Sequence, residues 1–135
     1  MRLAIERDPQ SENYRFAYGM LLTNAMAPKA AVIRLTEAIE LYPKSPRLWL
    51  GLGIAHFKAG SNAEAAKAFK RSLELDPNYA PAYAYLGMTS VEVGNYSEAV
   101  KTYERALAID ILPPAGHRHQ DAVHALGQAA DQLAG

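Results

Sequence analysis

Apolar and small residues recur along this chain with a period of 34 residues. Shifting the sequence by that interval superimposes small residues on small ones, large apolar residues on large ones, and prolines on prolines. The matched groups are Ala31, Ala65 and Ala99; Leu35, Phe69 and Tyr103; Gly19, Gly53 and Gly87; and Pro9, Pro43 and Pro77. All groups share one register, which predicts a chain built from repeated structural units.

The best-marked unit predicts two antiparallel helices. Ser45 suits a helix N-cap and a proline follows it at the first helical position, so we expect the first helix over about 46–58. Gly60 is expected to end that helix, since glycine is favoured just past a helix C-terminus. Ser61 and Glu64 then have the spacing of a capping box for the second helix.

Two glycines stand inside predicted helices at the same register. Glycine within a helix costs about 1 kcal/mol relative to alanine. Because Gly53 and Gly87 repeat this cost, we infer that the second helix of each hairpin crosses there too closely for a side chain. Ala65 and Ala99 are the expected small partners on those second helices.

The order of these residues resembles the tetratricopeptide repeat: Trp, Leu-Gly, an aromatic, Ala, an aromatic, Ala and a closing Pro. The pattern reads Trp49, Leu52, Gly53, His56, Ala65, Phe69, Ser72 and Pro77, and one period later Tyr83, Leu86, Gly87, Ser90, Ala99, Tyr103 and Ala106. An earlier repeat departs more, with Arg15 at the Trp position and Tyr18 at the Leu position. His56 and Ser90 also replace the usual aromatic. The resemblance covers roughly residues 2–111.

The resemblance implies an all-α fold, a right-handed superhelical stack of antiparallel helical hairpins (an α-solenoid). We expect a single domain over 1–135, with a partial repeat at 1–11, full repeats at 12–45, 46–79 and 80–113, and a capping helix at 114–135. That last segment has apolar residues on one side at helical spacing, as a helix closing the open face of a solenoid should.

The N-terminal residues resemble the last turns of a second helix. Leu3, Ala4 and Ile5 precede Asp8-Pro9, one period before Tyr42-Pro43. The matching first helix is missing, so we expect this chain to be a fragment of a longer protein; the alternative is a natural short N-terminal helix. A single helix of a repeat cannot bury its apolar face alone, so that face is expected to rest on the next repeat, to pair with another chain or to fray.

Composition narrows the functional classes. Lys plus Arg equals Asp plus Glu at 14 each, which argues against a nucleic-acid partner. No apolar run is long enough for a membrane helix, and the first residues are too polar for a signal peptide. With no Cys, thiol chemistry and Cys-ligated zinc are excluded. We expect a soluble protein that interacts with no membrane; the compartment is open, and the cytoplasm is favoured.

No constellation of catalytic residues is visible. The histidines are His56, His117, His119 and His124, and none has a carboxylate at the offset of a metal motif. No nucleophile–base arrangement or phosphate-binding glycine loop is present. The sequence therefore predicts a protein that is not an enzyme and has no metal site and no cofactor.

In the family the first helices of the repeats line a concave groove, and the resemblance maps this groove onto the chain. The candidate peptide-binding residues are Asn13, Phe16, Met20, Asn24, Arg47, Leu50, Ile54, Phe57, Lys58, Ala84, Met88, Val91 and Glu92. Most are apolar, and a large apolar patch rimmed by polar groups marks an interaction site. The alternative is that Ile54 and Phe57 belong partly to the core.

Some family members hold a C-terminal carboxylate with Lys and Asn at set groove positions. The matching positions here are Phe16, Met20, Gly51, Pro81 and Tyr85, so that clamp is absent.

These observations predict a protein–protein interaction module or scaffold that binds an apolar or amphipathic peptide in the groove. The structural alternative is a scaffold that assembles with itself, as a homo-oligomer, through its open N-terminal repeat. RNA binding, as in related helical-hairpin repeats, is disfavoured by the neutral charge. Enzymatic activity in a part of the parent protein beyond this sequence is the remaining hypothesis.

Overall fold

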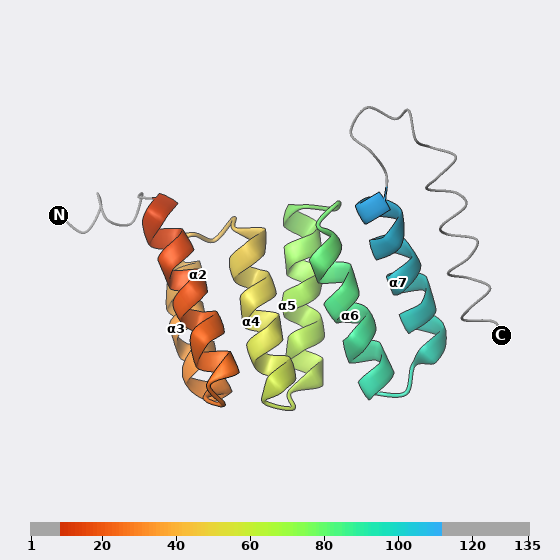
Figure 1. Cartoon of the computed structure of the whole chain (residues 1–135), viewed down its shortest axis with the longest axis horizontal. Helices are drawn as coiled ribbons and strands as arrows, with labels where there is room; N and C mark the ends of the chain where they lie inside the picture. The colour runs from red at the N-terminus through yellow and green to blue at the C-terminus, as the bar shows by residue number, and fades with distance from the viewer. Residues whose placement is uncertain (1–8, 112–135) are drawn as a thin grey trace. The chain divides into compact units, whose positions relative to one another are not determined.

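The computed structural model describes residues 9–111, and these residues form α-helices without any strand. The helices are α2 (Pro9–Asn24), α3 (Pro28–Leu41), α4 (Pro46–Lys58), α5 (Asn62–Leu75), α6 (Ala80–Glu92) and α7 (Tyr96–Ile111). They pair as the hairpins α2–α3, α4–α5 and α6–α7 (Figure 1). The all-α prediction is confirmed. The expected partial repeat at 1–11 lies mostly outside the described residues, and the capping helix lies wholly outside them.

The chain divides into two compact units, Met1–Pro77 and Asn78–Gly135. In the first unit, α2 packs on α3 and α4, α3 packs on α4, and α4 packs on α5. In the second unit, α6 packs on α7. Helix α2 starts at Pro9, whereas the first full repeat is expected to begin at residue 12.

Of the two N-terminal caps predicted from the sequence, at Ser45 and at Ser61, the structure contains only the first. Helix α4 has the predicted limits, and the Ser45 hydroxyl oxygen accepts a hydrogen bond from the Leu48 N–H at 3.2 Å. The expected capping box at Ser61 is wrong, since its side chain makes no cap hydrogen bond. Ser61 has ψ of 71°, whereas Ser45 is extended with ψ of 109°, the conformation typical of an N-cap.

The three hairpin turns share one geometry. The residues just past the first helices, Met26, Gly60 and Gly94, have φ of 64°, 83° and 81°. In each turn the next N–H donates to the carbonyl five residues back, as Ser61 does to His56 at 2.8 Å. This is the Schellman closure of a helix C-terminus, which normally places glycine in the left-handed conformation. Met26 therefore occupies a position that glycine fills in the other two turns.

The mid-helix glycines are close-contact positions, as predicted, and the atoms nearest to Gly53 and Gly87 belong to a large side chain of the second helix. A Cβ added at Gly53 would lie 2.6 Å from Phe69 Cδ1, and one at Gly87 would lie 3.1 Å from Tyr103 Cε1. The expected partner Ala65 is not among the nearest atoms to Gly53. The large side chain of the second helix thus covers the glycine, and Ala65 is also fully buried.

Candidate functional site

Helices α2 and α4 build a continuous surface in the first unit. We call it the α2–α4 surface and define it by Asn13, Phe16, Met20, Asn24, Arg47 and Lys58, which the sequence analysis placed in the groove. The α2 members recur at spacings of three, four and four residues, so they share one face of the helix. Arg47 and Lys58 are also eleven residues apart, three turns of α4.

The two helices meet at one end of this surface through Arg47. Its Nη2 donates a hydrogen bond to Asn13 Oδ1, and its guanidinium carbon lies 4.9 Å from the centroid of the Phe16 ring. A cation over an aromatic face is attracted by the ring quadrupole. Arg47 and Phe16 are both half-buried, whereas Asn13 is exposed. The guanidinium is therefore held in a fixed position at the edge of the surface.

Gly51 forms the junction between the two helices. A Cβ added there would lie 3.3 Å from Met20 Cε and 3.3 Å from Phe16 Cε1. Because no side chain stands at Gly51, Met20 and Phe16 can rest against the α4 backbone. The middle of the surface is therefore apolar and built from α2 side chains.

The other end of the surface is a hollow with mixed lining. Asn24 and Lys58 line it together with Thr23, Met26 and Pro28, around a volume of about 430 Å³. Thr23 is buried, and its hydroxyl donates to the Gly19 carbonyl at 2.9 Å, whereas Asn24 and Lys58 are exposed. Polar groups are thus available at both ends of an apolar middle.

Two predicted groove residues are not available at the surface. Leu50 and Ile54 are only 5% and 8% exposed, so the expectation of an exposed strip is wrong for both. The alternative that Ile54 belongs to the core is the one the burial supports. Phe57 is half-buried. Burial depends on which helices pack on a face, and the repeat pattern alone does not encode this.

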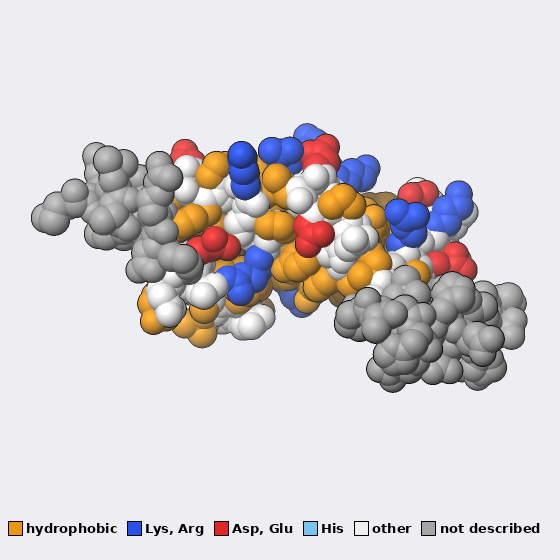
Figure 2. All heavy atoms as spheres, turned by 90° about the horizontal axis from the view of Figure 1, so that it is seen from above, with side chains coloured by type: hydrophobic (Ala, Val, Ile, Leu, Met, Phe, Trp, Pro, Cys, Tyr) orange, Lys and Arg blue, Asp and Glu red, His pale blue; other side chains and the backbone are white. Residues whose placement is uncertain are grey.

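The remaining predicted residues are on α6, in the second unit. Met88, Val91 and Glu92 are exposed, and Ala84 is half-buried. Their part in peptide binding stays a prediction. In the space-filling view, hydrophobic side chains are exposed between clusters of Lys, Arg, Asp and Glu on the described surface (Figure 2).

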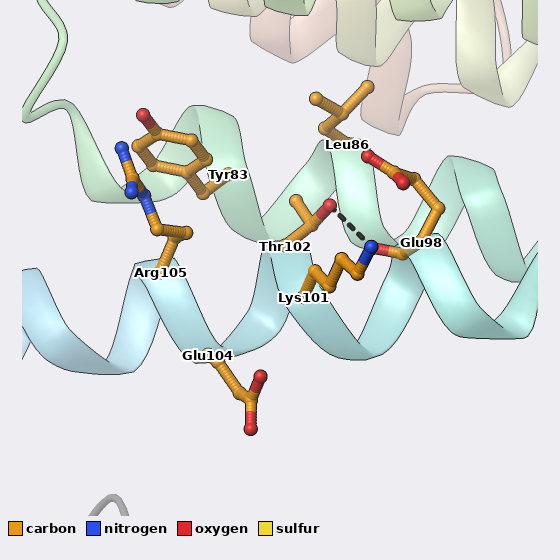
Figure 3. Close-up of a pocket in the computed structure, with 7 residues that line it drawn as sticks. All are labelled: Tyr83, Leu86, Glu98, Lys101, Thr102, Glu104 and Arg105. Carbon is orange, nitrogen blue, oxygen red and sulfur yellow. Dashed lines mark hydrogen bonds between the residues drawn. The ribbon is translucent and has the colours of Figure 1, made fainter.

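The second unit has a hollow of its own on the α6–α7 hairpin, with a volume of about 560 Å³. Figure 3 shows Tyr83 and Leu86 from α6 facing side chains of α7, and Thr102 donating to the Glu98 carbonyl at 2.7 Å. The Arg105 guanidinium lies 5.6 Å from the Tyr83 ring centroid. Acidic and basic side chains alternate along the α7 side, and the lining contains no nucleophile paired with a base.

The described residues show no cluster of metal ligands. Within 9–111, no group of three or more His, Cys, Asp or Glu could hold a metal ion. Burial lowers the pKa of His56 below its ordinary 6.5, although Glu64 opposes the shift. His56 is therefore a half-buried neutral packing residue near neutral pH. None of the described helices is long and apolar enough to cross a membrane.

Sequence reasoning missed an exposed row on α2 formed by Tyr14, Tyr18 and Leu21. The repeat register could have revealed this row, because its positions match the apolar residues Leu48, Leu52 and Ala55 one repeat later.

Comparison with known proteins agrees with this fold. Family models described as tetratricopeptide repeat match residues 28–80 and 56–110. The molecule is an all-α helical-repeat solenoid by class. The chain belongs to the tetratricopeptide repeat family. None of the curated proteins matches it in sequence.

Several solved structures share the fold. The TPR2B domain of yeast Sti1, in a complex with pHsp70, is 23% identical with a TM-score of 0.72, over 90% of this chain and 97% of that one. The second TPR of Spaghetti (RPAP3), bound to the HSP90 peptide SRMEEVD, is 21% identical with a TM-score of 0.70, over 77% and 96%. MamA is 24% identical with a TM-score of 0.67, over 97% and 73%. At identities this low, the similarity establishes the fold.

Proposed function

We propose that this chain is a protein-interaction module without enzymatic activity, which binds a short apolar or amphipathic peptide on the α2–α4 surface. One observation carries the proposal: an apolar middle made by Phe16 and Met20 lies beside a guanidinium that Asn13 holds in place. Neighbours of the same fold that are complexes with peptides support the same class of function.

The dimensions of the surface suit a short segment. Asn13 and Asn24 are eleven residues apart on α2, which corresponds to about 16 Å along the helix at about 1.5 Å per residue. An extended peptide rises about 3.3 Å per residue, so about five residues would span the surface.

The side chains also suit a peptide chemically. Phe16 and Met20 offer apolar contact, and a flexible Met adapts its shape to different ligands. Arg47 has five N–H donors, so the bond to Asn13 leaves others for a peptide carbonyl or carboxylate. Asn24 offers both a donor and an acceptor, which match the two groups of a peptide main chain.

The expected ligand differs from the HSP90 peptide of the Spaghetti complexes. Here Phe16, Met20 and Gly51 stand where carboxylate-binding family members have Lys and Asn. Gly51 has no side chain, and Phe16 and Met20 occupy the space above it. An apolar anchor residue should therefore contribute more to affinity than a terminal carboxylate.

The test starts from a displayed library of random peptides selected on the intact chain. The best peptide is then titrated against the wild type, Arg47→Ala, Lys58→Ala and the control Lys70→Ala, whose lysine is exposed on α5. We expect Arg47→Ala to weaken binding about ten-fold, or about 1.4 kcal/mol. Lys58→Ala should weaken it less, and Lys70→Ala should have no effect.

The peptide SRMEEVD serves as the negative ligand and should bind at least about ten-fold more weakly than the selected peptide. The proposal is wrong if selection yields no binder, or if Arg47→Ala and Lys58→Ala bind as Lys70→Ala does. Tight binding of SRMEEVD would instead indicate a carboxylate site that the α2–α4 surface does not provide.

A further inference from the structure

Helix α2 carries a second apolar face, on the side away from Phe16. Tyr14, Tyr18 and Leu21 follow one another at spacings of four and three residues, so they form one row, which we call the α2 stripe. Tyr14 is 69% exposed and Leu21 is 64% exposed. Side chains of this size are rarely left in water side by side without a partner.

The repeat register indicates what such a face does. One period later the same positions of α4 are Leu48, Leu52 and Ala55, and these are 0%, 8% and 0% exposed. They belong to one core cluster with residues of the preceding second helix, namely Ala31, Leu35, Ala38 and Ile39 of α3. The face is therefore the one by which a first helix receives the second helix of the hairpin before it.

Helix α7 offers the complementary face. It is the second helix of the last described hairpin, and its Ala99, Val100, Ala106 and Leu107 stand at the positions of Ala31, Val32, Ala38 and Ile39 in α3. Helix α5 matches α3 less well, with Ala66 and Ser72 at two of these positions. Leu107 is 36% exposed, whereas Ile39 is 8% exposed. The pattern that packs on α4 thus recurs on α7. Ala99 and Ala106 are buried, as Ala31 and Ala38 are, so Val100 and Leu107 form the accessible part, which we call the α7 face.

We infer that the α2 stripe docks a second copy of this chain, through the α7 face of that copy. The contact reproduces between molecules the packing of α3 on α4 within one molecule. A shallow hollow of about 360 Å³ between Ser11, Tyr14, Arg15 and Tyr18 gives a branched side chain such as Leu107 a place to insert. Tyrosine has an apolar ring and a polar hydroxyl group. It therefore suits a surface that is in contact with water in the monomer and is buried when two copies associate.

The two faces are different, so the contact is head-to-tail: it forms a closed ring if the rotation between copies closes, and an open chain if it does not. In either case the mass should rise with concentration to at least twice that of the monomer. This interaction is independent of peptide binding, because the α2 stripe and the α2–α4 surface share no residue.

The test measures the mass of the full chain by sedimentation over a concentration series. One variant, Tyr18→Lys with Leu21→Lys, removes the stripe; a second, Leu107→Lys, removes the α7 face. Ile33→Lys is the matched control, since Ile33 is 55% exposed on α3 and belongs to neither face. Circular dichroism verifies that each variant keeps its helices.

We expect the wild type and Ile33→Lys to reach at least twice the monomer mass as concentration rises, and each face variant to remain monomeric. A one-to-one mixture of the two face variants should then form a heterodimer, because each retains the face that the other lacks. Two results would overturn the inference. A wild type that stays monomeric means that other residues of the same chain cover the faces. A Leu107→Lys variant that still dimerises means that two α2 stripes pair with each other.

Discussion

At the scale of single residues, Gly53 and Gly87 have the same register but different neighbours. The Phe69 ring beside Gly53 is fully buried, whereas the Tyr103 ring beside Gly87 is half-buried. A buried ring cannot move away from an added methyl group, and overpacking of this kind typically costs about 1–3 kcal/mol. A half-exposed ring can shift by the few tenths of an ångström that a contact of 3.1 Å requires.

We therefore expect Gly53→Ala to lower the free energy of unfolding by about 1–3 kcal/mol. Gly87→Ala should be neutral or stabilising by up to about 1 kcal/mol, because alanine favours the helix. Urea unfolding of both variants, followed by circular dichroism, provides the comparison. Equal effects of the two substitutions would show that ring burial does not decide the outcome.

Met26 is the one described residue other than glycine with a positive φ. The left-handed conformation costs such a residue about 1–2 kcal/mol, and the Met26 side chain is 89% exposed, so it contributes little packing. Met26→Gly removes this strain, but glycine also gives the unfolded chain more entropy, which opposes the gain. The net result should be a rise of about 0.5–1 kcal/mol in the free energy of unfolding.

The converse change is Gly60→Ala, where φ is 83° and no atom lies within 4 Å of the added Cβ. It should destabilise the protein by about 1–2 kcal/mol through backbone strain alone. Thermal unfolding of the two variants should shift in opposite directions, and a shift in the same direction would refute the role of the turn geometry.

At the scale of the helix, Ser45 links two elements. Its hydroxyl caps α4 and at the same time donates to Glu12 Oε2 of α2 at 2.8 Å. Ser45→Ala should destabilise the protein by about 1 kcal/mol through loss of the cap, and somewhat more because Glu12 loses its donor. Ser61→Ala should change stability by less than about 0.5 kcal/mol, since Ser61 makes no cap bond.

Chemical denaturation of these two serine variants compares a formed cap with an unformed one in the same protein. If Ser61→Ala is as destabilising as Ser45→Ala, the side chain of Ser61 caps α5 in solution.

Helix limits were predictable from the sequence where the signals are local. Ser45 supplies a hydroxyl acceptor for a backbone N–H at the start of α4, and the ring of Pro46 restricts φ to a helical value. Neither effect depends on distant residues. The contact of Phe69 with Gly53 was not predictable in the same way. It depends on the rotation of α5 about its own axis, which the whole interface sets.

At the scale of the whole molecule, the repeat register predicted the fold class and its hairpins, because the same packing recurs each period. It did not predict which faces remain open. Leu50 and Ile54 were expected at the surface and are buried, and Tyr14 and Leu21 were overlooked and are exposed. A repeat pattern assigns each position to a face, but the neighbours present at that point of the stack decide whether the face is covered.

The division into two units also bears on the candidate site. The residues of the α2–α4 surface all belong to the first unit, so the proposed peptide binding would require only α2, α4 and the helices that support them. The α2 stripe belongs to the first unit and the α7 face to the second. Head-to-tail association would therefore join unlike units of successive copies, as α3 and α4 join successive hairpins.

Trp49 has a spectroscopic consequence, since it is the only tryptophan of the chain and lies in the first unit. Its ring packs against the core cluster, Arg71 lies 5.9 Å from its centroid, and its Nε1 donates to the Pro43 carbonyl at 3.1 Å. Tryptophan emission will thus report the melting of residues 9–77 alone, whereas ellipticity sums all helices. The two signals, recorded in one titration, separate the cooperativity of the first unit from that of the whole chain.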